Sequence, residues 1–109
     1  MRVAISTDGD QVAAHFGRCE AYTIADIEDG AVTHQEQIPN PGHSPGFLPK
    51  YLSERGVGCI VAGGMGPRAQ VLFDEKNIAT IVGVTGTIAE TLEVLAKGEL
   101  RGGESLCEH

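Results

Sequence analysis

Residues 57–84 read VGCIVAGGMGPRAQVLFDEKNIATIVGV, and this stretch decides the fold. Its two apolar runs, 57–64 and 78–84, are continuous and are typical of strands buried on both faces of a sheet. The segment between them, 66–77, has apolar residues at helical spacing and Pro67 at a first helical position. Because a helical crossover makes two strands parallel, the sequence predicts an α/β sheet.

The rest of the chain extends this unit in both directions. Downstream, Thr87 and Glu90 form a capping-box pattern at the start of a helix that ends at Gly98. Upstream, we expect strands at 2–6, 20–28 and 31–38, the last two as a hairpin, then a loop at 39–46 and a short helix at 47–55. The predicted order is β-β-β-α-β-α-β-α, with a five-stranded mixed sheet in a single domain over residues 1–109.

Charge and hydropathy exclude several classes of function. Fifteen acidic and eight basic residues give a net charge of −7, which disfavours a nucleic-acid partner because such partners are bound largely through Lys and Arg. No apolar run approaches the roughly 20 residues of a membrane helix. The N-terminus begins with a strand-like run and lacks the longer apolar region of a signal peptide. We therefore expect a cytoplasmic protein without a membrane partner, and the oligomeric state stays open.

The predicted topology brings four loops to one edge of the sheet. If strand 2–6 lies parallel beside strand 57–64, the loops 7–19, 39–46, 63–67 and 83–87 share that edge. Ligands of open α/β sheets usually bind at the carboxyl ends of the strands. His15 and His43 are thereby expected to face one pocket.

A second group of residues could bind a metal. His15, Cys19, Cys107 and His109 would supply two nitrogens and two sulfurs, a set that suits tetrahedral zinc, iron–sulfur species or copper(I). Their spacing is not that of a zinc finger. For the tail, residues 98–109, both a flexible end and a ligand-bearing segment remain open.

Other chemical patterns are weaker. Asp8, Asp10 and Asp26 lack a fourth acidic partner for a nuclease centre, and no pattern for acyl transfer is present. The glycines of AGGMGPRA match neither common nucleotide motif. They predict only that anionic oxygen or sulfide is tolerated beside Gly64 and Gly66, with Arg68 nearby.

Four segments together resemble a known family. They are the opening MRVAISTDGDQVAAHFGRCEAYTIADIEDG, the loop NPGHSPG, the run VGCIVAGGMGPRA and the close GVTGTIAETLEVLAKGEL. The chain resembles the dinitrogenase iron–molybdenum cofactor biosynthesis family, which includes NifX, the core of NafY and the C-terminal domain of NifB. The resemblance covers nearly the full length and implies a three-layer, ribonuclease H-like α/β fold.

The resemblance also implies a function and site residues. It implies non-catalytic binding, carriage or storage of an iron–sulfur or iron–molybdenum-type cluster, together with proteins that donate and accept it. It assigns cofactor binding to His15 of the HFG motif and, less directly, to His43, Cys107 and His109. Cys19, directly after HFGR, departs from the nitrogenase branch, so a stand-alone carrier is the expectation. A simple zinc or copper domain and a ligand-free interaction module remain the alternatives.

Overall fold

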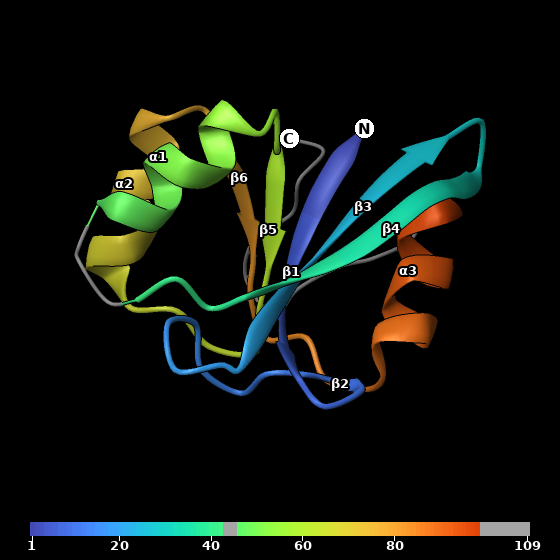
Figure 1. Cartoon of the computed structure of the whole chain (residues 1–109), viewed down its shortest axis with the longest axis horizontal. Coiled ribbons are helices and arrows are strands. Elements are labelled where there is room, and N and C mark those ends of the chain that lie inside the picture. Colours follow the sequence, from blue (N-terminus) through green and yellow to red (C-terminus); the bar gives the residue numbers. More distant parts are fainter. Residues whose placement is uncertain (43–45, 99–109) are drawn as a thin grey trace.

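The computed structural model describes residues 1–42 and 46–98 of the chain. Its elements are β1 (Arg2–Asp8), β2 (Gln11–Val12), β3 (Ala21–Glu28), β4 (Ala31–Pro39), α1 (Phe47–Glu54), β5 (Cys59–Val61), α2 (Pro67–Glu75), β6 (Ala79–Ile81) and α3 (Ile88–Ala96). Figure 1 shows α1 and α2 on one face of the sheet and α3 on the other. None of the described helices is long and apolar enough to span a membrane.

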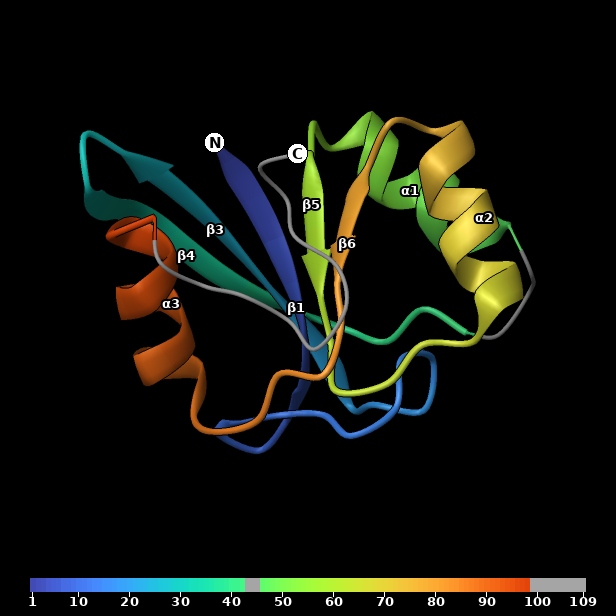
Figure 2. The ribbon, with the colours of Figure 1, turned by 180° about the vertical axis from the view of Figure 1, so that it is seen from behind.

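The sheet has the predicted pairing. Its strand order is β4-β3-β1-β5-β6, with β1, β5 and β6 parallel and with β3 antiparallel to both β1 and β4. The loops that follow β1, β4, β5 and β6 therefore meet at one edge, which we call the rim, and Figure 2 shows this edge from behind. The predicted α/β class, mixed sheet and layers are confirmed, whereas the assignment to the ribonuclease H-like group stays a prediction.

The prediction of five strands was wrong, because the described residues form six. The additional strand, β2, lies inside the loop expected at 7–19 and pairs with the end of β1, placing Thr7 opposite Val12. Gly9 has a φ of 62°, which allows the tight reversal between the two strands. A strand of two residues carries no periodic signal in the sequence, so this element could not be predicted.

Side chains of the central strands point alternately to the two faces of the sheet, so the core has two layers. Val3 and Ile5 of β1 pack in the cluster beneath α3, while Ala4 between them packs beneath α1 and α2. Cys59 is buried in the α3 layer, as its place in an apolar run predicts. The capping box of Thr87 and Glu90 is present at the start of α3, as predicted.

We expect the α1 layer to be sensitive to loss of volume. Leu52 of α1 is fully buried, so Leu52→Ala should lower the free energy of unfolding by about 2–5 kcal/mol through lost burial and a residual cavity. The matched control is Val71→Ala on α2, whose side chain is 57% exposed and whose loss should change stability by less than about 0.5 kcal/mol. Urea denaturation measures both; equal effects would contradict the assigned packing.

Candidate functional site

The loop between β2 and β3 is fastened to the turn that follows β5. The backbone N–H of Gly63 donates to the carbonyl of Ala13 at 2.9 Å, and the N–H of Phe16 donates to the carbonyl of Gly64 at 2.8 Å. Ala13 in turn donates to the carbonyl of Ser6 in β1 at 2.7 Å. These bonds fix the backbone on both sides of His15.

Two glycines make this close approach feasible. A Cβ at Gly63 would lie 2.8 Å from the carbonyl oxygen of Ala13 and 2.9 Å from Cα of Ala14, so no other residue fits without displacement. A Cβ at Gly64 would lie 3.0 Å from the oxygen of Ala14 and 3.7 Å from Nδ1 of His15. The His15 side chain is exposed, and its imidazole therefore stands at the surface directly beside Gly64.

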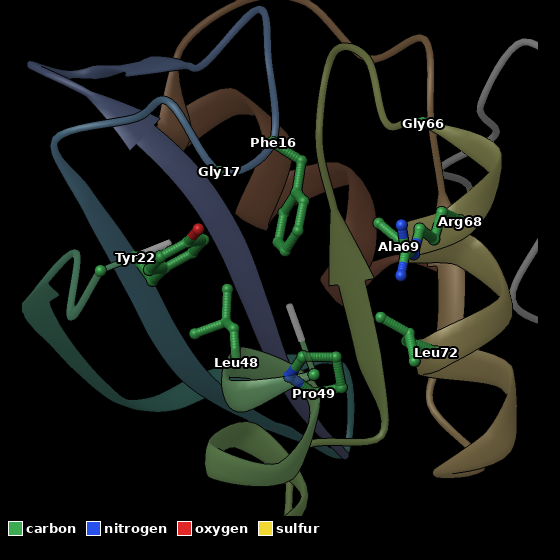
Figure 3. A pocket seen from close by; sticks show the side chains of 11 residues that line it. Phe16, Gly17, Tyr22, Leu48, Pro49, Gly66, Arg68, Ala69 and Leu72 are labelled. Atoms are coloured by element: carbon green, nitrogen blue, oxygen red, sulfur yellow. The ribbon is translucent and has the colours of Figure 1, made fainter. Parts of the chain in front are cut away.

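Next to His15, Phe16 turns inward and forms part of a pocket of about 320 Å³. Its ring meets Phe73 edge-on, with centroids 5.2 Å apart, and lies 6.0 Å from the ring of Tyr22. Figure 3 shows these walls, which come from the rim loop, α1 and α2 and are mostly apolar. The pocket is lined by Phe16, Gly17, Tyr22, Gly42, Gly46, Leu48, Pro49, Gly66, Arg68, Ala69 and Leu72.

Tyr22 brings an unusual polar atom to this apolar wall. The residue is fully buried, and its hydroxyl has no hydrogen-bond partner of good geometry among the described residues. Burial raises the pKa of Tyr22, and the neighbouring Cys19 thiol raises it further, so the hydroxyl keeps its proton. The hydroxyl has almost no exposed surface, so Tyr22 contributes its apolar ring to the pocket wall and no polar group that a ligand could reach.

The opposite wall carries the positive charge. Gly66 is the N-cap of α2, Pro67 occupies the first turn, and no side chain caps this helix start. Arg68 follows, exposed and at the pocket (Figure 3). Helix N-termini and guanidinium groups both favour anions. Gly66 and Arg68 both line the pocket, and the binding of an anion beside them stays a prediction.

The structure separates His15 from Cys19. Cys19 is 5% exposed and packs in the cluster beneath α1 and α2, and its carbonyl accepts a hydrogen bond from Asn40 at 2.9 Å. Within residues 1–42 and 46–98, no group of three or more His, Cys, Asp or Glu side chains is arranged to hold a metal ion. His43, Cys107 and His109 lie outside the described residues, so the four-ligand set stays a prediction.

Sequence reasoning missed the aromatic part of the site. Phe16, Tyr22 and Phe73 are three of only five aromatic residues in the chain, and they come from three separate segments. The sequence pattern assigns each of them to its own motif, strand or helix and gives no sign that the three side chains meet. The small number of aromatic residues is a signal that the sequence does offer. In a chain with few large side chains, those side chains often pack against one another.

Fold and site together define a small α/β domain with an open, largely apolar pocket at one edge of its sheet, flanked by a surface imidazole. The chain belongs to the dinitrogenase iron–molybdenum cofactor family, whose sequence profile matches residues 1–98. This confirms the family predicted from the motifs, and it supports an accessory role related to that cofactor.

Relatives agree over most of the chain. An uncharacterised protein of Methanocaldococcus jannaschii is 30% identical over 105 residues, which cover 92% of this chain and 89% of the relative. The crystal structure of PH0822 superposes with a TM-score of 0.86 at 31% identity, covering 95% of this chain and 97% of that one. The NMR structure of a candidate NifB protein from Thermotoga has a TM-score of 0.72 at 25% identity, covering 96% and 95%.

We expect Gly63→Ala to disturb the rim. Its Cβ would overlap the backbone at Ala13 and Ala14, so the free energy of unfolding should fall by about 1–3 kcal/mol. Amide chemical shifts of residues 13–16 should also move. Gly58→Ala is the control, because a Cβ there meets nothing within 4 Å. Unchanged shifts in Gly63→Ala would show that the loop is not seated on this glycine.

Tyr22→Phe should leave stability unchanged or raise the free energy of unfolding by up to about 1–3 kcal/mol, because it removes a buried hydroxyl without a partner. Thr23→Val on the same strand provides the contrast. The Thr23 hydroxyl hydrogen-bonds that of Thr7 at 2.7 Å in the core, so its removal should cost about 1 kcal/mol. Denaturation curves would refute this assignment if Tyr22→Phe were the more destabilising change.

Proposed function

We propose that this protein binds a metal–sulfur cluster, of iron–sulfur or iron–molybdenum type, at the rim and carries it between proteins without catalysing a reaction. The observation that carries the proposal is the exposed His15 imidazole beside Gly64, directly before Phe16, which lines a pocket that Arg68 also lines. Family membership supports this class of cargo. Action in the cytoplasm is part of the same proposal.

The chemistry of the pocket suits such a cargo. A sulfide-rich cluster is a bulky anion whose charge is spread over many atoms, and the Arg68 guanidinium can offset part of its desolvation cost against the apolar walls. The net charge of −7 provides no general attraction for an anion. Retention must therefore depend on local donors, namely His15, Arg68 and the N-terminus of α2.

An open site of this kind also suits transfer. One exposed imidazole holds a cluster less tightly than a closed cage of four ligands, and a partner protein can replace a surface ligand. Gly66 leaves open space beside the backbone, where a sulfide can approach, whereas the space beside Gly64 is taken by the carbonyl oxygen of Ala14. We assign further ligation to His43, Cys107 and His109. Cys19 remains a weaker proposal, because its thiol would have to leave the core.

Cluster loading without oxygen tests the proposal. The protein is incubated with iron, sulfide and molybdate, desalted, and analysed for metal, acid-labile sulfide and visible absorption. We expect coloured protein, and His15→Ala should lower the bound metal about tenfold or more, because the anchoring ligand is lost. His34→Ala is the matched control, since His34 is an exposed histidine on β4, away from the rim.

Two outcomes would contradict the proposal. Equal loading of the wild type and His15→Ala would remove the imidazole from the site. Colourless protein that retains zinc without sulfide would favour the simple metal-binding alternative. Circular dichroism of the unloaded variants shows whether a loss of loading reflects the site or the fold.

A further inference from the structure

Strand β4 leaves a long edge of the sheet unpaired. It is the outermost strand of the sheet, and within the described part of the chain only β3 pairs with it. Residues 31–37 are all exposed. Figure 2 shows β3 and β4 at the end of the sheet away from β6, which has only three residues. β4 is therefore the edge long enough to pair with another strand.

The hydrogen bonds of β3 determine which backbone groups of β4 point outward. Met1 and Ile27 exchange both of their hydrogen bonds, so the odd-numbered residues of β3 bond to β1. The even-numbered residues therefore bond to β4, as the bond from Asn40 N–H to the Glu20 carbonyl at 3.0 Å confirms. In register, the β4 residues that face β3 are His34, Glu36 and Ile38.

The N–H and C=O groups of Gln35 and Gln37 consequently face solvent along the open edge. In an antiparallel pair of identical strands, outward-facing residues must lie opposite outward-facing residues. Three registers are then centred on this segment: Gln35 opposite Gln35, Gln35 opposite Gln37, or Gln35 opposite Thr33. The three registers differ in which side chains lie opposite His34 and Glu36.

We propose that two copies of this chain pair through β4, antiparallel, with Gln35 facing Gln35 across a two-fold axis. In this register His34 of each copy lies opposite Glu36 of the other, and the regular ladder ends at the bulge formed by Thr33. Shifting the register in one direction sets Glu36 against Glu36, and shifting it in the other sets His34 against His34. An imidazole opposite a carboxylate can donate a hydrogen bond to it, whereas two carboxylates opposite each other repel, so the symmetric register is favoured.

The surroundings of the His34–Glu36 pair fit this arrangement. Nε2 of His34 and Oε2 of Glu36 already lie 4.0 Å apart in one chain, on one side of the strand. Two copies would bring two imidazoles and two carboxylates together in alternating order. Asp26, opposite His34 in β3, is bound by Arg2 at 2.7 Å, and this hydrogen bond lowers the pKa of Asp26. Asp26 is thus already neutralised by its own partner.

The residues of β4 favour pairing with a second strand, because they include few of the groups that block such pairing. Natural edge strands are often blocked by lysine, proline or an inward-pointing charge. Between residues 31 and 38 β4 has no Lys, Arg or Pro, and its one interruption is a bulge at Thr33, so the regular edge runs from His34 to Ile38. The net charge of −7 opposes association of two copies in general, so pairing must depend on the local ladder and the two His–Glu contacts.

Charge exchange tests both the dimer and its register. The full chain is examined by analytical ultracentrifugation over a concentration series as wild type, His34→Glu and Glu36→Lys. In His34→Glu the new carboxylate would face Glu36 of the second copy, and in Glu36→Lys the new ammonium would face His34. We expect each variant alone to dimerise at least about tenfold more weakly than the wild type. An equimolar mixture of the two should recover dimers, because each new charge then faces its opposite.

Glu54→Lys is the control, since it makes the same charge change at the exposed end of α1 and should leave the association unchanged. A wild type that sediments as a monomer throughout the series would overturn the proposal. So would dimers that persist equally in both variants, or a mixture that does not recover them. Cluster loading plays no part in this test, so its result is independent of the proposed function.

Discussion

The rim depends on one point of backbone contact, at Gly63. Its N–H donates to the carbonyl of Ala13 in the loop after β2, and its carbonyl accepts from the N–H of Gly83 in the loop after β6. One residue without a side chain thus connects three loops that lie 20 to 70 positions apart in the sequence. His15, Phe16 and the start of α2 take their relative positions from this junction.

The sequence predicts the framework of the fold well, because each main element has a local physical signal. The continuous run at 57–64 indicates a strand buried on both faces, Pro67 marks a helix start, and Thr87 with Glu90 marks another. Parallel pairing then follows from the crossovers. β2 escapes prediction because it forms only when Gly9 reverses the chain against β1, and two residues have no period.

The site is less predictable, because side-chain direction in a loop is set by contacts distant in sequence. Topology alone brings His15 to the rim beside the glycines of AGGMGPRA. The H-x3-C spacing does not reveal that Cys19 turns into the core, because Gly17, with a φ of 89°, reorients the chain between them. The aromatic walls are likewise invisible, because Phe16, Tyr22 and Phe73 meet only after the sheet and α2 have formed.

The contact at Gly63 also separates the backbone of the rim from the side chains that the rim presents. It is made by main-chain atoms of Ala13 and Ala14, while the side chains of Ala14 and His15 project into solvent. Exchanging either side chain therefore leaves the junction intact and replaces only the donor atom offered at the rim. Positions 14 and 15 thus set the chemical groups that the rim presents, while Gly63 alone sets the backbone geometry that presents them.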